Sequence, residues 1–280
     1  MKIAYPKILF FIPLPILSLL YTRGLPTITS ILSCILIFQI VSLSTQKKLY
    51  SILSLLIFIS WGIFSINFNS PIVFSLTFGL LMCFLFLYFS KTSKTRYLFL
   101  AGISAFIAVI FYKYLFFLIL VPPFIFAAFL PKGKIINLLT FSYGYIWGFI
   151  LFAVYLLISN SFPSFVNNLL LFREFHISFE NTTFQILMTF FLPFILCFLS
   201  FFLLFKRQRF HLLFLPSFAA IFSLSIIPNF TNPNYLNLAV SLSGILFSIL
   251  MRYSANSTVK VLCIIFSVLL ILNGAIMRYG

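Results

Sequence analysis

Acidic side chains are nearly absent from this sequence. Asp does not occur in its 280 residues, and the only glutamates are Glu174 and Glu180. Charged residues make up 7% of the chain, whereas a soluble domain carries about 25%. So few charges cannot keep a chain that is 63% hydrophobic in contact with water, and lipid is the expected solvent. The composition therefore predicts an all-α, polytopic transmembrane protein and excludes an ordinary soluble domain.

Clustered metal ligands are also missing. Each cysteine lies alone in an apolar run, and no two have the spacing of a metal site: Cys34, Cys83, Cys197 and Cys263. We expect them to pack as small apolar residues, with no metal and no cofactor. The formal charge of +16 would suit nucleic acid, but the Lys and Arg residues form small groups between apolar runs. This distribution predicts membrane topology and contacts with anionic lipid headgroups, and no nucleic-acid partner.

Ten apolar runs, separated by polar or basic turns, predict spanning helices. They are Pro26–Ser44, Tyr50–Asn67, Ile72–Ser90, Tyr97–Tyr112, Tyr114–Leu130, Ile135–Ile158, Phe184–Phe205, Phe210–Ile227, Tyr235–Met251 and Val261–Met277. The earlier run Ile8–Tyr21 is interrupted by Pro13 and Pro15 and is short for a span of about 20 residues. We expect ten or eleven spans in one transmembrane domain, residues 1–280, with a partial first helix in 1–25 and an extracytoplasmic loop at 159–183.

Basic residues fall on every second connection between these runs. One set comprises Lys47, Lys48, Lys91, Lys94, Arg96, Lys132, Lys134, Lys206, Arg207, Arg209, Arg252 and Lys260. The other set contains only Arg23, Lys113, Arg173 and Arg278. Because positive charge marks the cytoplasmic side, the first set predicts the cytoplasmic face of a multi-pass protein in a bacterial plasma membrane. The polar turns of the second set then share the extracytoplasmic face.

The segment Leu171–Thr183 concentrates the side chains that can do chemistry. It holds both glutamates, Arg173 and His176. These glutamates and the histidine are either ordinary loop residues or candidate bases. Lys113 ends another expected span between two tyrosines, as a snorkelling lysine in an aromatic belt or as a contact for a lipid phosphate. The second histidine, His211, follows a basic turn and is expected to be structural.

Several stretches, in chain order, resemble the GT-C class of membrane glycosyltransferases. They are Tyr5–Thr22 with Gly24 and Pro26–Ser44, then Asn69–Pro71, Ala101–Lys113 and Gly144–Asn167. The first resembles the family's proline-initiated helix, glycine turn and following span, and the others resemble its later turns, spans and loop. The class includes protein mannosyltransferases, lipid A aminoarabinose transferases and RgtA/B/C/D-like bacterial enzymes.

This resemblance implies a GT-C-like fold and a glycosyltransferase activity. The implied reaction moves a sugar from a polyprenyl-phosphate donor to an extracytoplasmic lipid or glycan acceptor. Lys113 and Arg173 would then bind the donor, because the leaving phosphate needs a cation. Glu174, Glu180 or His176 would be the catalytic base for the attacking hydroxyl. The implied partners are the polyprenyl-phosphate-linked sugar and membrane lipids.

The sequence departs from the family at its acidic positions. Family members carry an acidic residue, usually Asp, in a long first extracytoplasmic loop, whereas this sequence has no Asp at all. A second acidic position, after Pro71, is filled here by Ile72. The family's His-Tyr-Leu-Leu-Pro signature is reduced to Asn234-Tyr235-Leu236. We expect either an N-terminally truncated or degenerate relative that transfers sugar poorly, or a divergent enzyme whose base is one of its glutamates. The alternative is a non-catalytic membrane component of envelope polysaccharide assembly, either a pseudo-enzyme or a subunit associated with a flippase or a polymerase.

Overall fold

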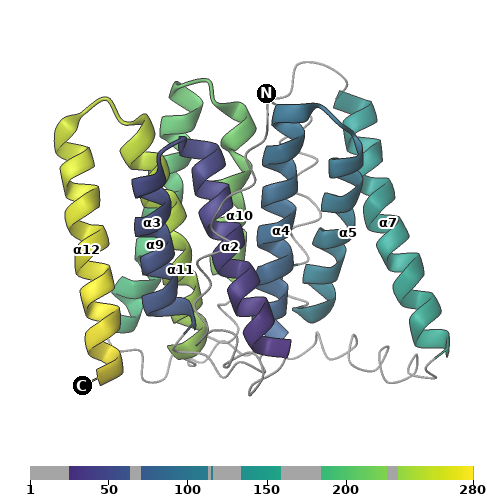
Figure 1. The fold of residues 1–280 in the computed structure, drawn as a ribbon, viewed down its shortest axis with the longest axis horizontal. Helices are drawn as coiled ribbons and strands as arrows, with labels where there is room; N and C mark the ends of the chain where they lie inside the picture. Colours follow the sequence, from purple (N-terminus) through teal and green to yellow (C-terminus); the bar gives the residue numbers. More distant parts are fainter. Residues whose placement is uncertain are drawn as a thin grey trace.

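The computed structural model describes residues 25–63, 71–112, 115, 134–158, 184–225 and 233–279. Within these ranges it contains nine α-helices and no β-strand (Figure 1). The helices are α2 (Leu25–Thr45), α3 (Lys48–Phe58), α4 (Pro71–Thr92), α5 (Arg96–Phe111), α7 (Lys134–Ile158), α9 (Phe184–Lys206), α10 (Phe214–Ser225), α11 (Pro233–Tyr253) and α12 (Ser257–Tyr279). The prediction of an all-α fold is confirmed for this part of the chain.

Nine of the ten expected spans coincide with these helices to within a few residues. The tenth, Tyr114–Leu130, and the partial helix expected before residue 25 lie outside the described residues. Two spans are less regular than predicted. The helix that begins at Lys48 changes from α to π geometry in η2 (Ile59–Ile63), and α10 is preceded by a 3-10 turn, η5 (Phe210–Leu212). The hydrophobic pattern therefore located the helices but not these local changes of geometry.

Three short connections contain a left-handed residue that is not glycine. Gln46, Ser93 and Gln208 have φ angles of 57°, 53° and 54°. Glycine is favoured at such positions because it has no Cβ atom. After Gln208, the Arg209 N–H donates to the Leu204 carbonyl at 2.9 Å, the bond that completes a Schellman motif at the end of α9. Backbone geometry therefore ends these helices in their polar turns.

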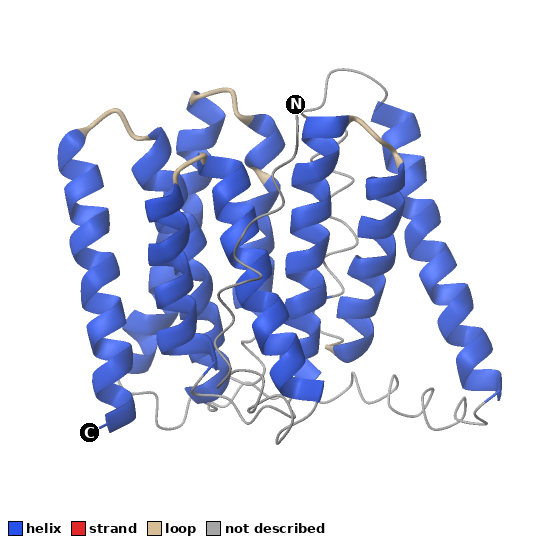
Figure 2. Ribbon diagram, viewed as in Figure 1, coloured by secondary structure: helices blue, strands red, loops and turns tan. Residues whose placement is uncertain are grey.

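Helices joined by short connections run in opposite directions, so their ends fall into two groups (Figure 2). The described connections 46–47, 93–95, 207–209 and 254–256 lie together at one end of the bundle. We call this the basic end, defined by Lys47, Lys48, Lys91, Lys94, Arg96, Lys206, Arg207, Arg209, Arg252 and Lys260. The helix termini at Ile63, Pro71, Phe111, Ile158, Phe184, Ser225 and Pro233 lie at the other end, which we call the opposite end (Figure 1).

The bundle is packed around α11. This helix contacts α2, α3, α9, α10 and α12, and every residue from Val240 to Met251 is buried. Small residues permit the close approach, since a Cβ atom on Gly244 would lie 3.0 Å from the Cα atom of Ser54 on α3. The Ser54 hydroxyl donates to the Gly244 carbonyl at 2.7 Å and also contacts the Ser248 hydroxyl. Small residues bridged by hydroxyl hydrogen bonds are typical of helix packing in lipid.

A second close contact joins α5 and α7 through glycines. A Cβ atom on Gly102 would overlap the Phe141 carbonyl oxygen, and one on Gly144 would overlap the Phe99 carbonyl oxygen. One turn further along α7, the nearest atoms to a Cβ on Gly148 would belong to the Phe106 side chain, its ring at 2.9 Å and its Cβ at 3.2 Å. The two helices therefore touch backbone to backbone at one level and backbone to ring at the next.

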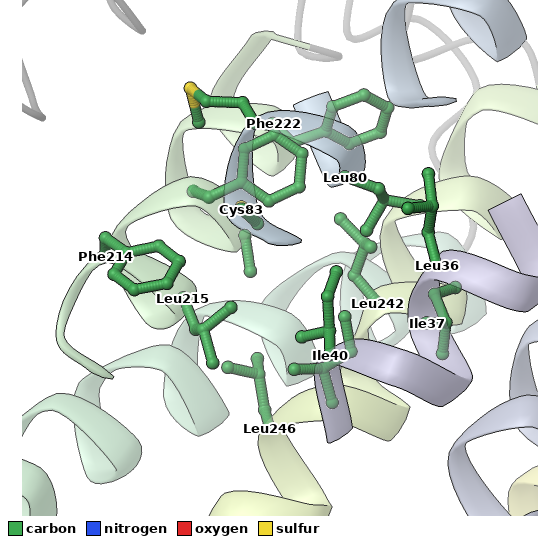
Figure 3. Close-up of a cluster of buried hydrophobic side chains, with 14 of the residues drawn as sticks. Leu36, Ile37, Ile40, Leu80, Cys83, Phe214, Leu215, Phe222, Leu242 and Leu246 are labelled. Atoms are coloured by element: carbon green, nitrogen blue, oxygen red, sulfur yellow. The ribbon is translucent and has the colours of Figure 1, made fainter. Parts of the chain in front are cut away.

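The hydrophobic core lies where α2, α4, α10 and α11 meet (Figure 3). Its side chains include Leu36, Ile37, Ile40, Leu80, Cys83, Phe214, Leu215, Phe222, Leu242 and Leu246. Polar contacts at its edge are satisfied within the protein, as where the hydroxyls of Ser33 on α2 and Thr77 on α4 lie 2.7 Å apart. This core holds the helix ends of both groups at fixed relative positions.

The outer surface between the two ends is apolar. α7, α9 and α12 expose large hydrophobic side chains along their length, among them Ile146, Phe202 and Leu269. The charged residues of these helices lie near their termini. Within the described residues, the helical stretches Ile72–Thr92 and Ile135–Ile158 are long and apolar enough to cross a membrane.

Trp61 of η2 forms a hydrogen bond with α12 and so helps to hold this helix against the bundle. Its side chain is buried, and its Nε1–H donates to the Leu270 carbonyl of α12 at 2.7 Å. Trp61→Phe keeps a large ring but removes this donor, so the free energy of unfolding should fall by about 0.5–1.5 kcal/mol. Equilibrium unfolding in SDS from mixed micelles measures it. The same substitution at Trp147, the other tryptophan and an exposed one, is the control, and equal losses at both positions would contradict this role.

Candidate functional site

The residues predicted to form the catalytic site are not among those the structure describes. Lys113, Arg173, Glu174, His176 and Glu180 all lie outside the described ranges. Their roles therefore remain predictions from the sequence. What the structure does describe is the set of helix ends that flank them in the chain.

These flanking ends lie together at the opposite end of the bundle. The segment with both glutamates lies between Ile158 of α7 and Phe184 of α9, and Lys113 directly follows Tyr112. The ends of α7, α9 and α5 are all on this side (Figure 1). The cations and carboxylates that the sequence assigned to one site are thus attached to helix ends on one side of the molecule.

Tyr112 anchors the end of α5 just before Lys113. The helix ends at Phe111, and Tyr112 has extended geometry with φ −144° and ψ 93°. Its buried side chain donates a hydrogen bond from Oη to the Ser225 carbonyl at 2.8 Å, at the end of α10. One turn earlier, the Ser75 hydroxyl of α4 donates to the Ala108 carbonyl at 2.6 Å. The chain is therefore held firmly against α4 and α10 at the point where Lys113 follows.

The basic end is the second charged region, and it has no counter-charge in the described part of the chain. None of the described residues is Asp or Glu. The Lys and Arg side chains of this end are mostly exposed.

Arg209 lies in the connection between α9 and η5, close enough to His211 and Tyr253 for its charge to act on both. We define the Arg209 junction as Lys91, Arg207, Arg209, His211 and Tyr253. The Arg207 Nε–H donates to the Tyr253 carbonyl at 3.2 Å, and the Tyr253 hydroxyl donates to the Ser44 carbonyl of α2 at 2.7 Å. η5, which carries His211, contacts α4, α9 and α10. The junction therefore joins the ends of α2, α4, α9 and α11.

The positive potential of the junction acts on His211. Partial burial lowers the pKa of this imidazole below its ordinary value, and the charges of Arg209 and Lys91 lower it further. The neutral form of His211 is therefore favoured, and in that form the ring has one donor and one acceptor nitrogen. The sequence predicted only a structural role for this histidine, because the proximity of Lys91, 120 positions earlier in the chain, is set by tertiary packing.

No metal centre forms among the described residues, which contain no group of three or more His, Cys, Asp or Glu side chains. The cysteines in this part of the chain are free and separate, in agreement with their apolar sequence context. No family model, curated protein or solved structure matches this chain. The function is therefore argued from the arrangement of the helices and their charged ends.

Proposed function

We propose that this protein is a multi-pass integral protein of a bacterial plasma membrane. The apolar outer faces of α7, α9 and α12 support this location, because a soluble protein rarely exposes apolar patches of this extent. Helix length supports it as well. Six helices have 21–25 residues, or about 31–38 Å, enough to cross a hydrocarbon core of about 30 Å.

The proposed orientation places the basic end in the cytoplasm. Clusters of Lys and Arg are retained on the cytoplasmic side during insertion, and here the described clusters share one end of the bundle. The opposite end, with the helix termini that flank Lys113 and the two glutamates, then faces the extracytoplasmic side.

Cysteine labelling tests the orientation. In a background without the four native cysteines, Ser178→Cys should react with an impermeant thiol reagent in intact cells. Ser93→Cys, in the connection between α4 and α5, should react only after the cells are opened. A protein labelled at position 93 but not at position 178 in intact cells would have the inverse orientation.

We further propose that the opposite end transfers a sugar from a polyprenyl-phosphate donor to a lipid or glycan acceptor, in the manner of a GT-C glycosyltransferase. One observation supports this proposal above the others: the helix ends next to Lys113 and next to the acid-bearing segment lie on the same side of the bundle. Donor binding and base catalysis both need their side chains within reach of one substrate.

The proposed reaction uses few groups. The acceptor hydroxyl attacks the anomeric carbon, the bond from that carbon to the phosphate oxygen breaks, and polyprenyl phosphate leaves. The hydroxyl proton passes to Glu174, Glu180 or His176. Lys113 and Arg173 stabilise the negative charge of the leaving phosphate. The Tyr112–Ser225 hydrogen bond supports this assignment for Lys113, since a site on a fixed helix end is positioned more accurately.

A non-catalytic role in envelope polysaccharide assembly is the second candidate. The observation in its favour is the scarcity of carboxylates, since this sequence contains two glutamates and no Asp. A subunit associated with a flippase or a polymerase needs the same helix bundle but no base.

A transfer assay separates the two candidates. Purified protein is incubated with polyprenyl-phosphate sugars and a lipid acceptor, and glycosylated acceptor and released polyprenyl phosphate are measured. Sugar transfer supports the enzyme. Donor binding without transfer supports the non-catalytic candidate.

For both candidates, Lys113→Ala should weaken donor binding by about 1–3 kcal/mol, and Lys113→Arg should weaken it by less.

A further inference from the structure

The cations of the basic end are not placed by the helix dipoles. Lys48 and Arg96 are the first residues of α3 and α5, and Lys260 lies in the first turn of α12. A helix N-terminus carries partial positive charge and favours acidic residues, yet no described helix has one in its first turn. Cations therefore occupy helix starts and helix ends alike on this side. This distribution follows the face and not the helix direction, as membrane topology predicts, and it provides a band of cations that a negatively charged group outside the protein can bind.

An exposed apolar face of α9 leads directly to the Arg209 junction. Phe198, Phe202 and Phe205 are exposed at helical spacing on this helix, followed by Lys206 and Arg207. A hydrocarbon chain can lie along such a face while a headgroup at its end reaches the cations. A soluble anion would need the cations but would gain nothing from the phenylalanines.

We propose that the Arg209 junction binds the phosphate of an anionic phospholipid whose acyl chains lie along the exposed face of α9. Arg209 is the principal contact, because a guanidinium can donate two parallel hydrogen bonds to phosphate oxygens. Lys91 supplies a second charge from α4, and the imidazole of His211 supplies a donor. The Arg207–Tyr253 and Tyr253–Ser44 hydrogen bonds hold the surrounding helix ends together.

This site rests on the proposed membrane location and not on sugar transfer, which belongs to the opposite end. The labelling experiment tests the location by itself, so a failure of one proposal can be distinguished from a failure of the other.

Lipid binding to the purified full chain in detergent tests the proposal. Native mass spectrometry is used to titrate dioleoyl phosphatidylglycerol and dioleoyl phosphatidylcholine. The wild type should bind the anionic lipid more tightly, and Arg209→Gln and Lys91→Gln should each weaken that binding by about tenfold or more, the usual effect of losing a charged hydrogen bond. Lys260→Gln is the control, since it removes the same charge from the same end on α12. Equal affinity for the two lipids, or equal losses in all three variants, would overturn the proposed site.

Two further arms keep the result unambiguous. Inorganic phosphate at millimolar concentration should not displace the lipid, and Phe202→Gln should weaken lipid binding. If phosphate displaces the lipid and Phe202→Gln has no effect, the junction binds a soluble anion and the proposal is overturned. Circular dichroism and gel filtration establish that each variant is folded. If Arg209→Gln does not fold, Lys91→Gln provides the same comparison, because Lys91 belongs to a different helix.

His211 provides a readout that a purely structural junction would not change. The charged groups that face it are Arg209 and Lys91. A bound phosphate favours the imidazolium form, so the pKa of His211 should be higher in phosphatidylglycerol nanodiscs than in phosphatidylcholine nanodiscs. The surface potential of the anionic bilayer raises this pKa in every variant, so the part due to a bound phosphate is the part of the difference that Lys91→Gln abolishes. The ring signals are followed by NMR and assigned by their loss in His211→Asn. An unchanged pKa in the two lipids would contradict phosphate binding beside this residue.

Discussion

Sugar transfer by the purified protein should fall by about 10²–10⁴-fold when the glutamate that acts as base is replaced with Gln, the usual contribution of general-base catalysis. Glu174→Gln and Glu180→Gln are made separately, because either residue is close in sequence to Arg173 and His176. Gln keeps the size of the side chain and its hydrogen-bonding ability but cannot accept the hydroxyl proton. The initial rate at saturating donor, with donor affinity measured in parallel, separates the loss of a base from the loss of binding.

The two variants control for each other. The glutamate that is not the base should change the rate little, and Arg173 beside Glu174 is expected to stabilise that carboxylate and so reduce its basicity. Turnover that is insensitive to both substitutions would leave His176 as the candidate base, and His176→Gln then tests it. Turnover insensitive to all three would mean that this segment supplies no base, and the assignment of the site to Leu171–Thr183 would be wrong.

Gly144→Ala should separate α5 from α7 and reduce the free energy of unfolding by about 3 kcal/mol, at the upper end of the usual effect of overpacking. The added Cβ would overlap the Phe99 carbonyl oxygen and lie 2.9 Å from the Phe99 carbonyl carbon. The backbone atoms of a helix cannot rotate away as a side chain can. The helices must therefore move apart, and the contact between them is lost. Equilibrium unfolding in SDS from mixed micelles measures the change.

Gly148→Ala provides a matched control on the same helix. Its Cβ would lie 2.9 Å from the Phe106 ring, which can move by changing its side-chain torsions. It would also lie 3.2 Å from the Phe106 Cβ, a contact that needs a shift of only a few tenths of an ångström. We expect a loss of about 1 kcal/mol or less for this variant. Losses of equal size at Gly144 and Gly148 would show that the backbone contact does not decide the packing of these helices.

The positions of the helices could be predicted from the sequence because the pattern that locates them is local. An apolar run such as that of α7 is bounded by charged or polar residues, and the helix begins and ends at those boundaries. The grouping of the basic residues at one end also follows from counting alternating connections, as the described ends confirm (Figure 2). The left-handed Gln208 has no sequence signal, because this position lacks the glycine that usually marks a positive φ, and the π geometry at Ile59 interrupts an apolar run that looks helical throughout.

The candidate catalytic site could be predicted only as a set of residues on one side of a membrane. Carboxylates are so rare here that composition alone directs attention to Glu174 and Glu180. The relative positions of these two carboxylates depend on how the chain folds outside the described ranges, and the spacing of the residues in the sequence does not determine them. The Arg209 junction is the reverse case. In the sequence its charges predict only membrane topology. Their proximity to His211 depends on how α4, α9 and α11 pack together.

The sequence by itself determined the class of fold and the two charged ends. In an apolar environment every backbone N–H and C=O group must find its hydrogen-bond partner within the protein, and an α-helix provides these partners within one segment. Only the tertiary structure decided that α11 is central, with Gly244 and Ser248 allowing α3 to approach it. It also decided that Gly102 and Gly144 are contact points. A glycine or serine in an apolar run looks the same whether it faces lipid or a neighbouring helix. Which of them are contacts depends on which helix faces pack together, a relation between segments that are far apart in the chain.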